Sequence, residues 1–189
     1  MKFILGKKLG MSQIFNEKGN FVPVTLIEAG PCQITQIKDK AVQVGFIKKT
    51  KRIKKTEKGK EFKYLREFRI QNPELKTGDM IDVSAFQEGD MAKISGISKG
   101  KGFQGVVKRW GFHGRPTTHG MKHEGRTPGS VGCSGPERVI KGKKLAGHYG
   151  ACSVSVKNLL IVKIDKENNL IAVRGAVPGP KGALLEISI

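Results

Sequence analysis

The sequence has few acidic residues, few aromatic residues and no long apolar run. Asp and Glu number 16 against 35 Lys and Arg, which gives a formal net charge of +19. Apolar residues make up 38% of the 189 residues, so we expect a hydrophobic core for part of the chain and not for all of it. No apolar run approaches the ~18 residues of a membrane-spanning helix, and the run after Lys2 is too short for a signal peptide.

Cysteine is also scarce. Cys32, Cys133 and Cys152 are an odd number, and their spacing fits neither a disulfide framework nor a C-x-x-C motif. We therefore expect free thiols in a reducing compartment. Together with the missing signal peptide, this predicts a cytoplasmic protein.

The excess of positive charge is confined to two segments. Residues 99–152 hold eleven basic and two acidic residues, and residues 48–69 hold eleven basic and three acidic ones, which leaves a net charge of +2 for the other 113 residues. So large a charge needs an anionic partner, and a pI near 10 is typical of nucleic-acid-binding proteins. A membrane surface is the other candidate partner.

Segment 99–152 is unusual in composition as well as in charge. It contains thirteen of the 25 glycines, all four histidines and the one tryptophan, Trp110. A glycine every three or four residues disfavours both a helix and a long strand, and the segment has too few large apolar side chains to fold alone. A segment of this length without regular structure is expected to be functional or to be ordered by a partner.

The regions on either side have the alternating, β-branched pattern of short strands. We expect a strand at 22–27, hairpins of 34–38 with 41–47 and of 159–165 with 170–175, and a last strand at 183–189. The pattern predicts a mainly β fold, a small β-barrel formed by residues 1–98 and 153–189. Segment 99–152 would be an irregular Gly/Lys/Arg-rich extension inserted in this barrel, and 48–69 a basic loop that leaves it.

Residues 100–105 match the dinucleotide-binding motif G-x-G-x-x-G, which requires a preceding strand and a following helix in a βαβ unit. Residues 92–98 could supply the strand. However, 106–110 are too short a helix before Gly111, and no second strand completes the unit. We expect the glycines instead to let the backbone lie close to phosphates.

The histidines and cysteines allow two other interpretations. His119 with His123, and His148 with Cys152, have a spacing loosely compatible with a zinc site. Neighbouring Arg and Lys side chains would repel the ion, so we expect no metal and no cofactor. Cys133 with His148 could form a nucleophilic pair, but no local motif supports one, and we expect no enzymatic activity. His in such a segment more often stacks on bases or binds phosphate.

Aromatic residues interleave with the basic residues of 99–152. Phe103, Trp110, Phe112 and Tyr149 would offer π-faces to unstacked bases. The densest basic runs, at 48–52 and 141–144, lack the acidic neighbours that a solvated face would carry. The combination favours RNA as the partner.

Several blocks of the sequence resemble one known family. They are GKKLGMSQIF at 6–15, SKGKGFQGVVKRWGF at 98–112, THG at 118–120, PGSVG at 128–132, KGKKLAG at 141–147 and GAVPG at 175–179. In this order, over nearly the whole chain, they resemble the bacterial branch of the universal large-subunit ribosomal protein three family.

The resemblance implies a barrel of the translation-protein type, whose extension reaches through ribosomal RNA toward the peptidyl transferase centre. It also implies a structural role in the ribosome: binding large-subunit rRNA, helping to nucleate assembly and contacting neighbouring large-subunit ribosomal proteins. No membrane and no small-molecule substrate is expected. The residues expected to bind rRNA are Lys48, Lys49, Lys51, Arg52, Lys99, Lys101, Phe103, Lys108, Arg109, Trp110, His113, Arg115, His119, Lys122, His123, Arg126, Arg138, Lys141, Lys143 and Lys144.

The tip of the extension is expected beside the peptidyl transferase centre. Its residues are small and uncharged, which suits close packing against folded RNA: Ser130, Gly132, Cys133, Ser134 and Gly135. Some bacterial members of the resembled family carry an N-methylated Gln at this tip. Residues 132–136 contain no Gln, so we do not expect that modification here.

Overall fold

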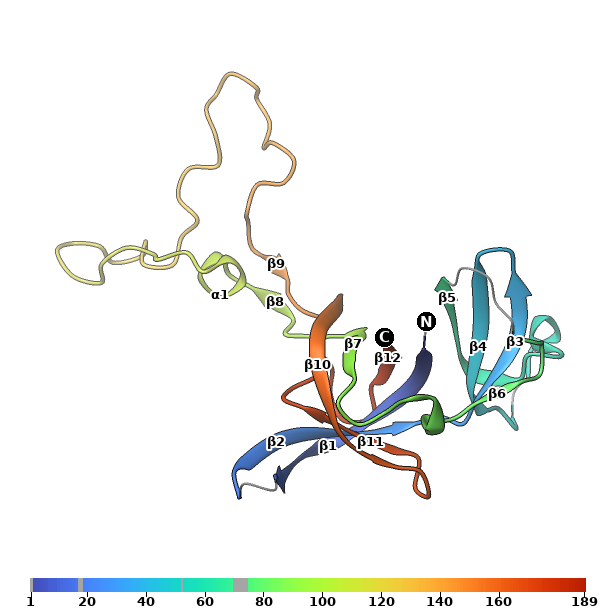
Figure 1. Cartoon of the computed structure of the whole chain (residues 1–189). Coiled ribbons are helices and arrows are strands. Elements are labelled where there is room, and N and C mark those ends of the chain that lie inside the picture. Colours follow the sequence, from blue (N-terminus) through green and yellow to red (C-terminus); the bar gives the residue numbers. More distant parts are fainter. Residues whose placement is uncertain (1, 17–18, 52, 70–74) are drawn as a thin grey trace. The chain divides into compact units, whose positions relative to one another are not determined.

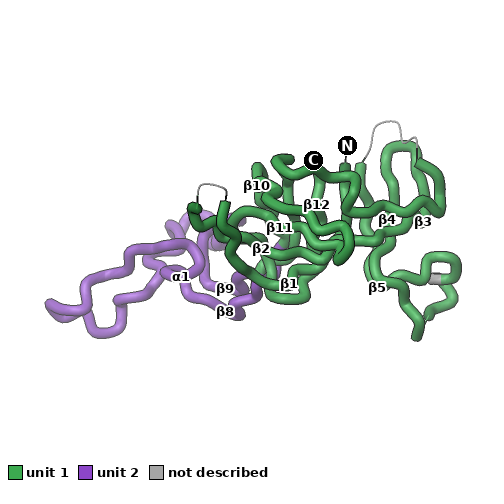
Figure 2. The backbone as a smooth tube through the Cα atoms, turned by 60° about the horizontal axis from the view of Figure 1, so that its bottom comes forward, with its two compact units in different colours: residues 1–98, 153–189 green, residues 99–152 purple. Residues whose placement is uncertain are grey.

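The computed structural model describes residues 2–16, 19–51, 53–69 and 75–189. The chain forms two compact units, which Figure 2 shows in different colours. Unit 1 comprises Met1–Ser98 and Ser153–Ile189, and unit 2 comprises Lys99–Cys152, the segment in which glycine and basic residues are concentrated.

Six antiparallel strands of unit 1 close into a barrel, in the order β1-β12-β7-β10-β11-β2 (Figure 1). Their bounds are β1 Phe3–Phe15, β2 Phe21–Ala29, β7 Met91–Ile97, β10 Ser153–Asp165, β11 Leu170–Arg174 and β12 Leu184–Ser188. The mainly β fold class predicted from the sequence is confirmed. So is the hairpin about residues 166–169, which joins β10 to β11.

Alternating side chains of these strands fill the barrel. Ile4, Ile27, Ile94, Ile161 and Ile187 each have no exposed surface. Full burial of a side chain of this size stabilises the fold by roughly 1.5–3 kcal/mol, so unit 1 has the core of an independent domain.

A second, four-stranded antiparallel sheet in unit 1 has the order β5-β4-β3-β6. Its strands are β3 Cys32–Lys38, β4 Ala41–Lys48, β5 Phe62–Arg69 and β6 Met80–Ile81. The hairpin predicted at 34–38 and 41–47 is therefore present, but its assignment to the barrel was wrong. Pro31 has no N–H and cannot continue a ladder, and Gly30 before it has a positive φ of 73°, so the chain leaves the barrel after β2.

The sequence predicts a loop over 48–69, but the last third of this segment forms the strand β5. The alternation of β5 directs one row of its side chains onto the core: the Phe68 ring stacks on Phe3 with centroids 4.7 Å apart, and the Tyr64 ring stacks on Phe46 at 6.5 Å. Arg66 also forms an ion pair of 2.9 Å with Glu186 of β12. Basic residues are interspersed with the aromatic residues of β5, so the sequence did not show a clear strand pattern there.

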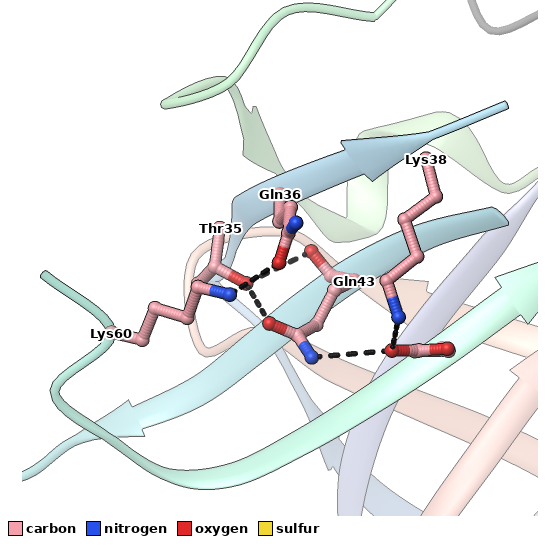
Figure 3. Close-up of polar contacts among 6 residues, drawn as sticks. Thr35, Gln36, Lys38, Gln43 and Lys60 are labelled. Carbon is pink, nitrogen blue, oxygen red and sulfur yellow. Dashed lines mark hydrogen bonds and ion pairs between the residues drawn. The ribbon is translucent and has the colours of Figure 1, made fainter. Parts of the chain in front are cut away.

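The outward face of this second sheet carries a polar network, drawn in Figure 3. Thr35 Oγ1 donates to Gln43, 3.2 Å from its backbone oxygen and 3.0 Å from Oε1, and Lys60 donates to the Gln36 side chain. Lys38 Nζ lies 2.5 Å from Glu67 Oε1, and this hydrogen bond is the main cause that holds the pKa of the Glu67 carboxyl below its usual range. The charge of Lys38 is therefore compensated on this face.

The structure contains no disulfide among the three cysteines, all of which lie in described segments. Cys32 is fully buried, and its thiol donates to the Leu5 carbonyl oxygen at 3.5 Å. Loss of hydration on burial raises the pKa of this thiol to about 12. Cys133 and Cys152 are exposed.

Unit 2 contains little regular structure. Its elements are β8 Phe103–Gln104, the helix α1 Val106–Trp110 and β9 Gly147–His148. Of residues 99–152, all of which are described, only Val106 is a buried hydrophobic residue. Unit 2 therefore has no hydrophobic core of its own.

Candidate nucleic-acid interface

The two ends of unit 2 pair with each other. Phe103 pairs with His148 and Gln104 with Gly147, and the ladder continues because Lys101 N–H donates to Tyr149 O at 2.8 Å. Gly150 closes this ladder with a φ of 77°, and a Cβ there would clash with the Lys99 carbonyl oxygen. Only glycine fits this position without strain.

This pairing gathers aromatic and basic side chains on one short ladder. The Phe103 ring is 69% exposed and meets His148 edge to face, with centroids 6.2 Å apart. Lys101 Nζ lies 4.8 Å from the centre of the Tyr149 ring. Tyr149 was expected to offer a π-face to bases, but the sequence did not indicate that Tyr149 and His148 lie on the same ladder as Phe103. Their distance in sequence from Phe103 concealed that they lie beside it.

A second cluster forms around α1. The indole Nε1–H of Trp110 and the guanidinium of Arg109 both donate to the Leu145 carbonyl oxygen, at 2.9 Å and 2.8 Å. The Arg109 guanidinium lies 5.1 Å from the Trp110 ring centre, and Lys144 Nζ lies 5.8 Å from it. Arg109 also lies against Gly147, where a Cβ would meet its guanidinium. Arg109 therefore holds α1 against the returning chain, while Trp110 stays 42% exposed.

Beside Trp110 lies an open pocket of about 480 Å³. It is lined by the chain that leaves α1, by the stretch 127–129 and by Lys144, so it is bordered by the cations Arg115 and Lys144 and by the imidazole of His113. Arg115 forms a surface ion pair with Glu124. A concave surface with an indole and cations at its border can accept an unstacked base together with its phosphate.

The basic side chains of unit 2 are exposed, with the exception of the half-buried Arg109. They are distributed along both arms of the segment: Lys99, Lys101, Lys108, Arg115, Lys122, Arg126, Arg138, Lys141, Lys143 and Lys144. Only two carboxylates, Glu124 and Glu137, accompany them. The structure leaves these cations on the surface, where an anionic polymer can reach them.

Close backbone contacts hold the two ends of the loop that carries His119 and His123. Arg115 N–H donates to Gly125 O at 3.1 Å, and a Cβ at Gly114 would clash with that oxygen. Within the described ranges, no three His, Cys, Asp or Glu side chains lie close enough together to hold a metal ion. The structure thus does not bring His119, His123, His148 and Cys152 together as a zinc site.

The tip residues 130–136 are all exposed. Ser130 Oγ lies 3.1 Å from the Gly132 carbonyl oxygen and accepts from the Gly132 N–H at 3.3 Å, which forms a small local turn. Gly132 has a φ of 154°. This stretch offers backbone and small side chains, and no charge, to whatever it contacts.

The basic run at 48–52 belongs to unit 1, at the end of β4. Lys48 and Lys51 are exposed, and the Lys49 N–H donates to Glu61 O at 2.7 Å, which folds the chain back toward β5. Arg52 lies outside the described residues. In the part of the chain that the structure describes, no helix is long and apolar enough to cross a membrane.

Comparison with known proteins identifies the family. The sequence matches the family described as ribosomal protein L3 over residues 60–170. The large ribosomal subunit protein uL3 of Desulfotalea psychrophila is 46% identical, over 97% of this chain and 96% of that protein. The proteins of the same name from Pelotomaculum thermopropionicum and Dehalococcoides mccartyi are 47% and 46% identical, over 98% and 97% of this chain and 95% and 96% of their own lengths. The resemblance inferred from the sequence is confirmed: the chain belongs to the ribosomal protein L3 family.

Proposed function

We propose that this chain binds large-subunit rRNA through unit 2 and the basic run at 48–52, and that it helps to nucleate assembly of the subunit. As a member of its family, it is a structural, non-enzymatic constituent of the large subunit of the cytoplasmic ribosome. Its partners are rRNA and neighbouring ribosomal proteins.

The observation that carries the proposal is the exposed charge of unit 2. Eleven basic residues stand against two acidic ones over 54 residues, and ten of the eleven are exposed. Ordering so glycine-rich a chain costs about 1–2 kcal/mol per residue in backbone entropy, and Val106 alone gives it a buried side chain. Contact with phosphates would offset this cost, since each neutralised phosphate releases condensed counterions.

The aromatic clusters favour RNA with unpaired bases over a uniform helix. Stacking a base on an exposed aromatic ring contributes about 1–3 kcal/mol. Both Phe103 and Trp110 are exposed, and Trp110 lies beside the cations Arg109 and Lys144. We therefore assign Phe103 and Trp110 to unstacked bases, and the lysines around them to phosphates.

For the tip, residues 130–136, we propose a steric role beside the peptidyl transferase centre. The position comes from the family resemblance, and the support from this chain is the uncharged, exposed backbone of the tip. Enlarging Ser134 to Tyr should leave subunit assembly intact but change inhibition of translation by antibiotics that bind that centre. Unchanged inhibition curves for several bulky substitutions at Cys133 and Ser134 would count against this role.

The direct experiment compares binding of the whole chain to large-subunit rRNA and to vesicles of anionic lipid over a range of salt concentrations. We expect tight rRNA binding whose logarithm falls linearly with the logarithm of salt concentration, by roughly 0.7–0.9 for each phosphate contact. Preference for the vesicles, or rRNA binding that does not depend on salt, would contradict the proposal.

A further inference from the structure

The second half of β1 extends past its partner β12, and one of its edges is unpaired there. β12 pairs with β1 only from Phe3 to Lys7, and the contact ends where Gly182 N–H donates to Lys8 O at 2.7 Å. From Met11 to Phe15, β1 pairs with β2 on one side, and no strand of the described chain pairs with it on the other. This is the far end of the β1–β2 hairpin in Figure 1.

The backbone groups at this edge can be assigned from the two neighbouring ladders. Asn16 N–H donates to Asn20 O at 3.1 Å, so the backbone groups of Asn16 face β2. Since successive residues of a strand face opposite sides, those of Met11, Gln13 and Phe15 face away from β2. Three N–H donors and three carbonyl acceptors therefore line the open edge at two-residue intervals.

The opposite strand of the same hairpin is protected, whereas β1 is not. Pro23 stands directly across from Gln13, has no N–H to offer, and its carbonyl oxygen accepts from Gly175 N–H at 2.9 Å. Proteins commonly guard such edges with proline or lysine. Residues 11–15, Met-Ser-Gln-Ile-Phe, contain neither.

The hairpin residues that form this edge are uncharged and largely apolar. In a chain of net charge +19, residues 9–16 and 19–27 contain no charged residue. The side chains of Met11, Phe15 and Phe21 are 56%, 65% and 55% exposed, and the two rings meet edge to face at 6.5 Å. The side chain of Lys181 lies beside Gly10, at the end of this edge nearest β12. The strand residues themselves carry no charge, so this stretch complements a neutral, partly apolar partner better than a phosphate.

We propose that the β1 edge from Met11 to Phe15 binds an extended, uncharged segment of another large-subunit protein, which adds to the barrel sheet as a strand. Backbone hydrogen bonds to Met11, Gln13 and Phe15 would fix its register, and the exposed side chains would pack against it. The class of partner rests on the proposed function, since the ribosome surrounds the chain with other proteins. The open edge itself does not depend on it.

The first test places a photoreactive benzoylphenylalanine at Gln13, in chains incorporated into intact large subunits. We expect irradiation to crosslink this position to one segment of one other ribosomal protein, identified by mass spectrometry. Crosslinks to rRNA alone, to a second copy of this chain, or to nothing would overturn the inference. Absence of the wild-type chain from large subunits would instead refute the proposed function, so the two failures are distinguishable.

The second test removes one edge donor. Gln13→Pro deletes an outward N–H and keeps the β1–β2 ladder, and Gln13→Thr is the matched control. We expect Gln13→Pro to lower the affinity for the crosslinked protein roughly five- to tenfold, as expected for one hydrogen bond, with rRNA binding unchanged. If Gln13→Pro does not fold, Met11→Lys with Phe15→Lys keeps every N–H and protects the edge by charge. Normal content of the crosslinked protein in subunits that carry either folded variant would overturn the inference.

Discussion

Unit 1 and unit 2 are stabilised by different means. In unit 1, buried residues of the barrel and the second sheet form one hydrophobic cluster, which includes Leu5, Ile34 and Ile94. Unit 2 has a short ladder, one helical turn and two cation–π clusters, and Val106 is its single buried side chain. The comparison shows that one chain combines a unit with its own hydrophobic core and a unit without one. We propose that contact with rRNA supplies the free energy that orders the second unit.

The largest expected effect is on the free energy of unfolding of unit 1. Ile94→Ala removes a fully buried side chain from the barrel and should cost about 2–5 kcal/mol. Val131→Ala, at a 46% exposed position of unit 2, should change it by less than about 0.5 kcal/mol. Urea unfolding followed by circular dichroism measures both, and losses of equal size would remove the distinction between the units.

The next effect concerns the salt dependence of rRNA binding. Replacing Lys141, Lys143 and Lys144 by Ala should flatten the slope of log K against log salt by about two to three, since each lysine would lose one phosphate. The charge-matched control replaces Lys40, Lys93 and Lys163, which are exposed in unit 1. If the two triple variants lose the same slope, binding depends on net charge and not on unit 2.

A smaller effect is expected at the aromatic cluster of unit 2. Trp110→Ala should weaken rRNA binding by about 1–3 kcal/mol, the contribution of one stacked base. Trp110→Phe keeps a π-face but loses the hydrogen bond to Leu145, so it separates stacking from the local fold. Full affinity in the Ala variant would show that the indole serves only to hold α1.

The smallest expected effect is a difference in thiol reactivity between the cysteine of unit 1 and those of unit 2. Cys32 of unit 1 is buried and its pKa is raised to about 12, so its thiol should resist alkylation near neutral pH, while the exposed Cys133 and Cys152 react. Because the folded pKa exceeds the usual value of 9.0, its contribution to stability is complete below about pH 9 and is lost as pH rises toward 12. Mass spectrometry of the alkylated chain tests this, and rapid labelling of Cys32 in the folded protein would contradict it.

Local patterns predicted the local parts of the fold. The β3–β4 and β10–β11 hairpins are present because alternation and short turns are encoded in neighbouring residues. The extent of β1 was not predicted, since Gly6, Gly10 and the lysines between them weaken the strand pattern. A Cβ at Gly6 would meet Ile27, so tertiary packing and not propensity explains that glycine.

Long-range pairing could not be deduced from the sequence. Nothing near Phe62 indicates that β5 will pair with β4 across the basic stretch between them, so the second sheet was missed. In the candidate interface, the basic and aromatic residues were recognisable by type. That Phe103 lies beside His148, and that Arg109 contacts Leu145, depends on the return of the chain some forty residues later.

The most direct test of the comparison replaces 99–152 with a short Gly/Ser linker. Ile97 and Ser153 are paired neighbours in β7 and β10, so a few residues can join them without strain. We expect the shortened chain to keep one cooperative unfolding transition with its β circular dichroism signal, and to lose most of its salt-dependent affinity for large-subunit rRNA. An unfolded product, or a folded one that binds rRNA with an undiminished salt slope, would contradict the account.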